Sequence, residues 1–275
     1  ANHGDTVLIA DGTYPLSAQI NVPRALTIRS ENGSGTTFID GQHACRPFYV
    51  THPDTILDGL TIANGNSTMI GSNNYGGGIC FLNGGTLLNS AVLGNTATGN
   101  VSGGYGYARG GGVYCAVTGR IENCLLSGNT ATGGETSGGG LYCDGPILVT
   151  DCEITGNEAI GGTHWYYYGC GGLGGGAALR NGARMEQSRI SNNRAKGNSN
   201  MYPGGAIGAG IHCVSATVAR CIIQNNLGIS GNISTRGDSG AAGGGAYLNA
   251  GSLLENCLIS GNTVTGIYMY ADAYG

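Results

Sequence analysis

An internal repeat limits what this chain can fold into. The segment from Gly110 to Gly133 reads GGGVYCAVTGRIENCLLSGNTATG, and five near-copies surround it. These copies begin at glycine-rich triplets that start at Gly76, Gly138, Gly174, Gly208 and Gly243. A unit this thin cannot bury an apolar face by itself, so such repeats stack on one another and form a solenoid.

Equivalent positions of the six copies alternate between apolar and polar residues. This period of two predicts β-strands, and no stretch shows the 3.6-residue periodicity of a helix. We therefore expect an all-β chain with two or three short strands in each unit of roughly 24 residues. The second strand carries a Ser/Cys row and then an aliphatic row: Ser90, Cys124, Cys152, Ser188, Cys221 and Cys257, followed by Val92, Leu126, Ile154, Ile190, Ile223 and Ile259.

One asparagine recurs at the same place in the turn that follows the second strand. The row consists of Asn95, Asn129, Asn157, Asn193, Asn226 and Asn262. Stacked side-chain amides can hydrogen-bond from one unit to the next and satisfy polar groups that the turn would otherwise bury unpaired. The sequence therefore predicts an asparagine ladder along one corner.

The repeat resembles those of right-handed parallel β-helix proteins of bacterial surfaces, within the pectin-lyase-like superfamily. GGVY at 111–114 and NCLLSGNTA at 123–131 carry the likeness to polymorphic outer-membrane and anchored-adhesin repeats. The resemblance implies an all-β, right-handed parallel β-helix whose coils lie about 4.8 Å apart, with variable inserts at one corner. It implies less about activity, because the superfamily includes lyases, hydrolases and non-catalytic stalks.

The chain is expected to form one β-helix domain over residues 1–275, since a solenoid grows lengthwise. Residues 1–65 read as less regular first coils, 76–266 as six regular repeats and 267–275 as a tail. Neither end shows a cap, so we expect either head-to-tail stacking of subunits into a filament or a piece excised from a longer helix.

Composition excludes several classes of partner. The net charge is −4 with only 12 Lys and Arg, so no basic surface for nucleic acid is expected. No apolar run is long enough to span a membrane in this segment. Ten cysteines suit a secreted or cell-surface protein. Stacked pairs such as Cys115 with Cys143, or Cys124 with Cys152, are read either as buried thiols or as disulfides.

Inserts of variable length separate each repeat from the next glycine triplet, and all leave from one corner. They are rich in Gly, Ser, Asn and aromatic residues, a composition typical of contact surfaces. This edge could bind glycans of a host or matrix, or a protein; alternatively, its rings cover the flank of the solenoid. The candidate binding residues are Tyr105, Tyr107, Trp165, Tyr166, Tyr167, Tyr168 and Tyr202.

Weak catalytic candidates come from an outward acidic stripe. Glu122 and Glu186 belong to it, and Arg189 lies near it in the sequence. The acidic positions fall two coils apart, about 10 Å, which is at or beyond the carboxyl separation of inverting glycosidases. A solvated face with ion pairs between coils is the simpler interpretation.

No metal or cofactor is expected, because the five histidines lack metal-ligand spacing. His212 shares its position with Tyr114 and Tyr142 and is predicted to be a surface residue. Three N-x-S/T sites open inserts and are candidates for glycosylation: Asn66, Asn100 and Asn232.

Two functions therefore remain open. The first is a non-enzymatic extracellular structural or adhesive β-helix. The alternative is a polysaccharide lyase or glycoside hydrolase of the superfamily that the repeats resemble.

Overall fold

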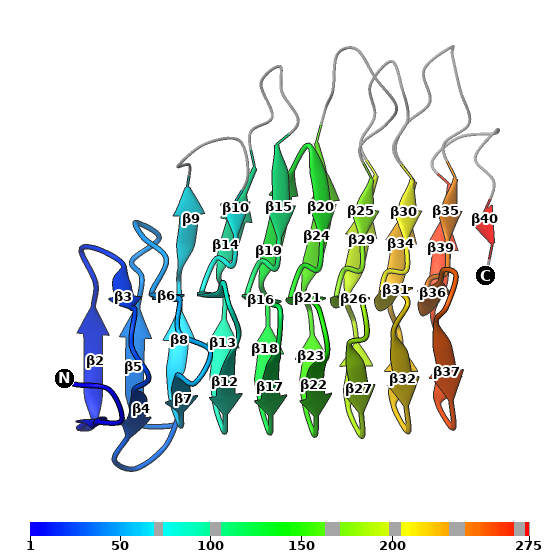
Figure 1. Cartoon of the computed structure of the whole chain (residues 1–275). Helices are drawn as coiled ribbons and strands as arrows, with labels where there is room; N and C mark the ends of the chain where they lie inside the picture. The colour runs from blue at the N-terminus through cyan, green and yellow to red at the C-terminus, as the bar shows by residue number, and fades with distance from the viewer. Residues whose placement is uncertain are drawn as a thin grey trace.

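The chain is a right-handed parallel β-helix, in which every described strand pairs in parallel with the equivalent strand of the neighbouring coil (Figure 1). The computed structural model describes residues 1–68, 74–99, 106–162, 171–197, 205–230, 240–266 and 273–274. Five sheets, here called A to E, run along the array. No helix in these ranges is long and apolar enough to cross a membrane.

Sheets A, B and C enclose the main core. Sheet A consists of β1 (Thr6–Ile9), β4 (Thr27–Ser30), β7 (Ile56–Asp58), β12 (Gly85–Leu88), β17 (Gly119–Glu122), β22 (Ile147–Thr150), β27 (Arg184–Glu186), β32 (Thr217–Ala219) and β37 (Leu253–Glu255). Sheet B consists of β2 (Gly12–Pro15), β5 (Thr37–Asp40), β8 (Thr61–Ala63), β13 (Ala91–Leu93), β18 (Leu125–Ser127), β23 (Glu153–Thr155), β28 (Arg189–Ser191), β33 (Ile222–Gln224) and β38 (Leu258–Ser260). Sheet C consists of β3 (Ile20–Val22), β6 (Phe48–Val50), β11 (Ile79–Phe81), β16 (Val113–Ala116), β21 (Leu141–Asp144), β26 (Ala177–Arg180), β31 (Ile211–Val214) and β36 (Ala246–Leu248).

Sheets D and E form a ridge on this core. They begin only at Asn66, whereas sheets A, B and C begin with the first three strands of the chain. Sheet D consists of β9 (Asn66–Thr68), β14 (Thr96–Thr98), β19 (Thr130–Gly133), β24 (Glu158–Gly161), β29 (Arg194–Lys196), β34 (Leu227–Ile229) and β39 (Thr263–Thr265). Sheet E consists of β10 (Asn74–Tyr75), β15 (Tyr107–Arg109), β20 (Glu135–Ser137), β25 (Gly172–Leu173), β30 (Ala206–Ile207), β35 (Ala241–Ala242) and β40 (Ala273–Tyr274).

The predicted side-chain rows are confirmed by the strand register. Leu126 of β18 pairs with Val92 and Ile154, and all three side chains are fully buried. Cys115 pairs with Cys143 in sheet C, also inside. Because successive residues of a strand point to opposite faces, one inward position per strand is enough to build a continuous core along the solenoid.

The asparagine ladder is confirmed as well. The Oδ1 atom of Asn129 accepts hydrogen bonds from the backbone N–H of Asn95 at 3.0 Å and from its Nδ2 at 2.9 Å. The Nδ2 atom of Asn129 donates to the carbonyl of Val92 and to Oδ1 of Asn157, both at 2.9 Å. The side chain is fully buried, so this pattern satisfies polar groups that have no access to water.

Full coils contain five strands, not the two or three expected. The short segment GETS at 134–137 lies where an insert is expected between two repeats, but Glu135–Ser137 forms strand β20 of sheet E. The ridge is thin because its two sheets meet through small side chains, among them Ala97, Ala108 and Ala131, which are fully buried together. Short strands of small residues give no apolar alternation, which is why the sequence did not reveal them.

The coil turns at single residues in the left-handed region of backbone conformation. Gly138 has φ of 69° between sheets E and C, and Gly128 has φ of 65° between sheets B and D. Glycine adopts this conformation without a steric penalty, and asparagine tolerates it better than most residues. One such residue per corner keeps every coil superposed on the next.

Candidate functional site

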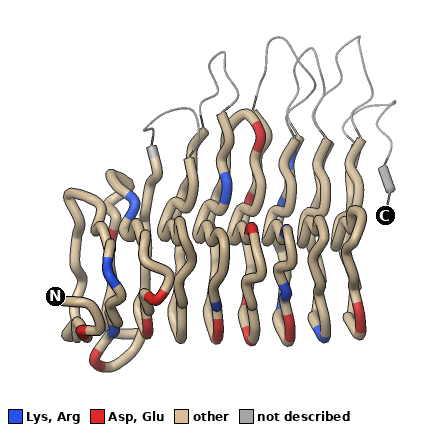
Figure 2. The backbone as a smooth tube through the Cα atoms, viewed as in Figure 1, with Lys and Arg blue, Asp and Glu red and all other residues tan. Residues whose placement is uncertain are grey.

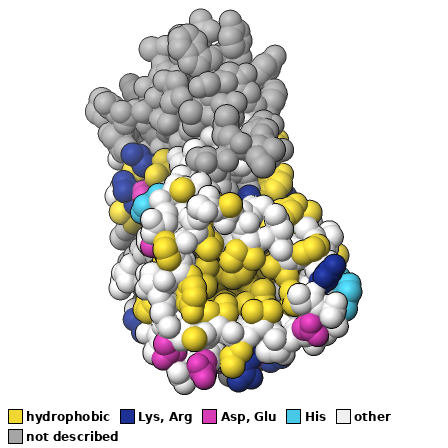
Figure 3. All heavy atoms as spheres, turned by 90° about the vertical axis from the view of Figure 1, so that its left-hand side faces the viewer, with side chains coloured by type: hydrophobic (Ala, Val, Ile, Leu, Met, Phe, Trp, Pro, Cys, Tyr) yellow, Lys and Arg dark blue, Asp and Glu magenta, His cyan; other side chains and the backbone are white. Residues whose placement is uncertain are grey.

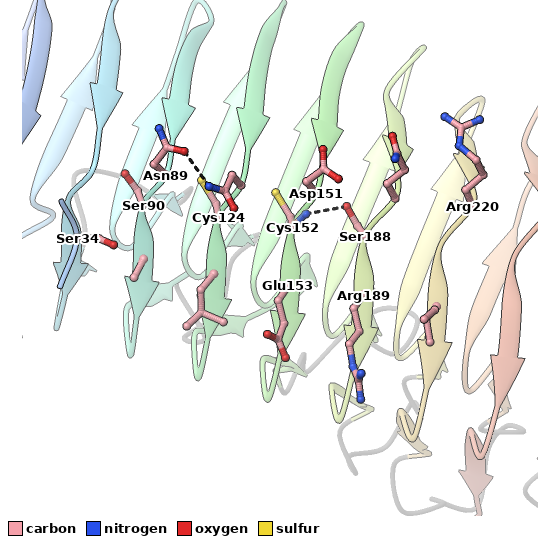
Figure 4. A pocket seen from close by; sticks show the side chains of 15 residues that line it. Ser34, Asn89, Ser90, Cys124, Asp151, Cys152, Glu153, Ser188, Arg189 and Arg220 are labelled. Carbon is pink, nitrogen blue, oxygen red and sulfur yellow. Dashed lines mark hydrogen bonds between the residues drawn. The ribbon is translucent and has the colours of Figure 1, made fainter.

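A groove of about 650 Å³ follows the corner between sheets A and B across successive coils (Figure 4). Three rows of residues line it, one contributed by each segment of the corner. The rim beside sheet A consists of Asn89, Asn123, Asp151, Gln187 and Arg220; the floor of Ser90, Cys124, Cys152 and Ser188; and the rim beside sheet B of Ala91, Leu125, Glu153, Arg189 and Ile222. Figure 2 shows charged residues to be sparse over the array. Several of them lie along the lower edge of that view, where sheets A and B meet.

Backbone conformation places the first rim. Asn89, Asn123 and Asp151 have φ of 48°, 52° and 52°, the left-handed conformation that Asn and Asp tolerate. Gln187 and Arg220 adopt it too, with φ of 48° and 54°. A residue of that kind is strained by about 1–3 kcal/mol, which the pairing on both sides must offset.

The side chains of the floor form hydrogen bonds with backbone groups at the corner. Ser188 Oγ accepts from the backbone N–H of Cys152 at 3.1 Å and donates to the carbonyl of Glu186 at 2.7 Å. Cys152 Sγ donates in the same way to the carbonyl of Thr150 at 3.1 Å. Serine and cysteine both occur in this row because each is small and both donates and accepts.

The described cysteines are free thiols, and most of them are buried. Seven of the nine are buried, Cys45 and Cys257 are partly exposed, and Cys170 lies outside the described ranges. Burial raises the pKa of Cys115 to about 12. The hydrogen bond to the Cys124 thiol, together with burial, raises the pKa of Cys152. The thiolate, which is the nucleophilic form, is therefore disfavoured at Cys115 and Cys152, whereas the hydrogen bond with Cys152 lowers the pKa of Cys124.

The acidic stripe has the register that the sequence predicted. Glu122 pairs with Thr150, Thr150 with Glu186, Glu186 with Ala219 and Ala219 with Glu255. Its carboxylates therefore lie on alternate coils, about 10 Å apart. At that spacing they do not form the closely facing carboxyl pair of a retaining glycosidase.

Arginines form ion pairs with two of these carboxylates, Glu122 and Glu186. Arg120 forms an ion pair with Glu122, two residues further along the same strand. Arg184 and Arg220 both form ion pairs with Glu186, Arg220 from the next coil. The hydrogen bond from Arg184 lowers the pKa of Glu186. A general acid needs the opposite shift, toward neutral pH.

Arg189 lies on the other side of the corner. It pairs in register with Glu153 in sheet B, and both side chains extend away from Asp151 and Arg220 in Figure 4. The structure therefore does not bring Arg189 together with Glu122 and Glu186 into one constellation. Arg220, the partner of Glu186 in the next coil, is not among the candidates from the sequence. It directly follows Ala219, the register partner of Glu186, and this position in the repeat is the signal that indicates the contact.

Most candidate binding residues lie outside the described ranges: Tyr105, Trp165, Tyr166, Tyr167, Tyr168 and Tyr202. Tyr107 lies half-buried on β15, with the guanidinium of Arg109 4.9 Å from its ring centroid. The role of these residues in binding stays a prediction.

The glycosylation candidates Asn100 and Asn232 are also outside the described ranges. Asn66 opens β9, where its Nδ2 donates to the carbonyl of His43 at 3.0 Å. The side-chain nitrogen to which a glycan would be attached is thus engaged in a hydrogen bond in this structure. Its modification remains a prediction.

The prediction that His212 is a surface residue is wrong. Only 6% of its surface is exposed, and its ring stacks on Tyr247 with centroids 5.8 Å apart. The outward face of sheet C carries His212, and the ridge covers that face. Burial lowers the pKa of His212 to about 4. Among the described residues, no cluster of His, Cys, Asp and Glu could hold a metal ion.

Comparisons with known proteins give little beyond this geometry. No family model and no curated protein matches the chain. Among solved structures, a pectin methylesterase from Aspergillus niger has a TM-score of 0.42 and 10% identity, covering 97% of this chain and 78% of its own. A pectate lyase has a TM-score of 0.38 and 17% identity, covering 99% and 70%. Such values carry no argument about activity. The strand pairing itself establishes the fold: the chain is a right-handed parallel β-helix, as the resemblance of its repeats implied.

Proposed function

We propose that this protein is a non-enzymatic, secreted or cell-surface β-helix that serves as a structural stalk and makes adhesive contacts through its insert edge. The observation that carries the proposal is the double ion pair of Glu186 with Arg184 and Arg220. The best-placed carboxylate of the outward stripe is thereby paired with one arginine of its own strand and with one of the next coil. The pair with Arg220 links two coils, which suits a structural rod, and an exposed ion pair contributes about 0–1 kcal/mol.

The ridge supports the adhesive part of the proposal. The segments 69–73, 100–105, 163–170, 198–204 and 231–239 each join a strand of sheet D to a strand of sheet E. They are thus attached in a row along one edge, interrupted at the coil where Gly134 alone joins β19 to β20. Contacts repeated at such spacing give avidity without a tight individual site.

Incubation with uronic-acid polysaccharides and calcium tests the non-enzymatic part. We expect no ultraviolet absorbance from unsaturated products and no new reducing ends. Turnover that disappears in Glu186→Gln would show that the protein is instead a lyase or hydrolase. Glu255→Gln, in the same row two coils away, is the matched control for general effects of removing a carboxylate.

A binding experiment tests the adhesive part. The protein is applied to an array of matrix and host glycans, beside a variant in which Trp165, Tyr166, Tyr167 and Tyr168 are all replaced by Ala. We expect the variant to lose binding at least tenfold, while Tyr14→Ala, an exposed ring far from the ridge, binds normally. Equal binding of both variants would exclude the insert as the contact surface.

A further inference from the structure

A second cavity, of about 550 Å³, lies where the ridge begins. Sheet C starts with β3 and β6, whereas sheets D and E start only at β9 and β10. The outward face of β6 therefore has no partner strand of sheet E among the described residues. The space in front of it is bounded by Tyr49 of β6 and by the first strands of the ridge.

A column of aromatic rings ends at this cavity. Tyr114 and Tyr142 stack on the outward face of sheet C with centroids 5.4 Å apart and planes 6° from parallel. Tyr75 of β10 stacks on Tyr114 at 4.7 Å. It is the last ring of this stack, and it lines the cavity together with Tyr49. Another planar ring at this end would continue the column in the offset-stacked geometry that aromatic groups prefer.

A positive charge without an acidic partner lies beside these rings. Arg46 donates from Nε to the carbonyl of Gly76 at 2.8 Å and from Nη1 to Gln19 Oε1 at 3.2 Å. Its guanidinium lies 5.3 Å from the ring centroid of Tyr49. None of the ion pairs among the described residues includes Arg46, and no Asp or Glu lines the cavity. A guanidinium has five N–H donors, so three remain for a ligand.

We propose that this cavity binds a small aromatic carboxylate. Its carboxylate pairs with the free N–H groups of Arg46, a geometry that guanidinium groups favour. Its ring packs between Tyr49 and Tyr75 at the end of the column. The cavity has the size and mixed apolar and polar lining of ordinary small-molecule sites.

Titration calorimetry with 4-hydroxybenzoate tests the proposal on the full 275-residue chain. We expect saturable binding that is at least tenfold weaker for 4-hydroxybenzamide, which lacks the charge. Glucuronate, a hydroxylated carboxylate without a planar ring, should bind more weakly than 4-hydroxybenzoate. Absence of saturation by 4-hydroxybenzoate, or tighter binding of glucuronate, would overturn the proposal.

A variant tests the contact with Arg46. Arg46→Gln should weaken binding of 4-hydroxybenzoate at least tenfold but leave binding of 4-hydroxybenzamide unchanged. Arg29→Gln, an exposed arginine on sheet A, is the control for net charge. Circular dichroism checks folding, and Arg46→Lys supplies a second variant that keeps the charge but loses the planar fork. Equal affinity of wild type and Arg46→Gln for 4-hydroxybenzoate contradicts the assignment.

Discussion

At the scale of single residues, the rows of this solenoid differ in how strictly they are specified. The asparagine row is uniform, because each amide must both accept from one coil and donate to another. The Ser/Cys row accepts either serine or cysteine, since Ser188 and Cys152 each donate to a carbonyl two residues earlier. A row therefore tolerates only those residues that reproduce its hydrogen bonds.

His212 breaks the aromatic row of sheet C and makes stability depend on pH. Its folded pKa is about 4, whereas an unfolded histidine titrates near 6.5. Between these values the unfolded chain binds the proton and the folded chain does not. The contribution of neutral His212 to the free energy of unfolding is therefore fully present above about pH 6.5. Up to about 3 kcal/mol of it is lost as the pH drops to 4. Urea unfolding of wild type and His212→Phe across this range measures the difference.

The variant should lack this part of the pH dependence, because it has no imidazole to protonate. His3→Phe, at an exposed position, serves as control and should retain the slope of the wild type. Parallel curves for wild type and His212→Phe would mean that the buried ring does not contribute. Arg180, whose positive charge also lowers the pKa of His212, offers a second test through Arg180→Gln, which should reduce the loss.

At the scale of strands and sheets, the sequence was enough to predict sheets A, B and C but not the ridge. Aliphatic residues at every second position, such as Val92 and Leu126, mark a buried strand plainly. Strands such as Gly172–Leu173 and Ala206–Ile207 have two residues each, too few for any periodicity. The sequence does not show the ridge, and without the ridge the outward position of His212 in sheet C is expected to be exposed. In the structure this side chain is buried.

The candidate site was predictable in part for the same reason. Register follows from the repeat, so the alternate-coil spacing of Glu122 and Glu186 could be read from the sequence. The direction of long side chains could not, because Arg184 and Arg220 reach Glu186 through rotamers that the repeat does not encode. Nor could the cavity at Arg46, since it exists only where the ridge begins.

The glycine triplet between sheets E and C allows coils to approach closely, and this gives a sharp test. A Cβ on Gly139 would lie 2.3 Å from the carbonyl oxygen of Gly175 and 2.4 Å from the carbonyl carbon of Glu158. These are backbone atoms of paired segments and cannot move independently. We expect Gly139→Ala to lower the free energy of unfolding by about 3 kcal/mol or more. Gly35→Ala has no atom within 4 Å of the added methyl group and should change stability little.

Thermal unfolding followed by circular dichroism compares the two glycine variants. A wild-type melting temperature for Gly139→Ala would show that the coils can separate locally without loss of pairing. The comparison is informative because both substitutions reduce the entropy of the unfolded chain equally, so the difference reports the contact between coils.

At the scale of the whole molecule, the two ends of the array expose surfaces that every inner coil buries. Ile259 of the last coil is 47% exposed, whereas Ile223, its register partner in the preceding coil, is fully buried. Figure 3 shows hydrophobic side chains gathered in the centre of the opposite end face. Further coils, or the end of a second copy, would cover such surfaces and pair the free strand edges.

For the 275-residue chain we expect end-to-end association that grows with concentration, because a head-to-tail contact of this kind does not close on itself. Sedimentation velocity should show species beyond the 27.7 kDa monomer. Ile259→Lys places a charge at the centre of one end face and should restore the monomer, since inward-pointing charges block edge pairing. Ile222→Lys, at a position 37% exposed on the side of the array, should leave association unchanged. A single monomeric species at all concentrations, in wild type as in Ile259→Lys, would mean that exposed core and open edges are not enough to join two copies.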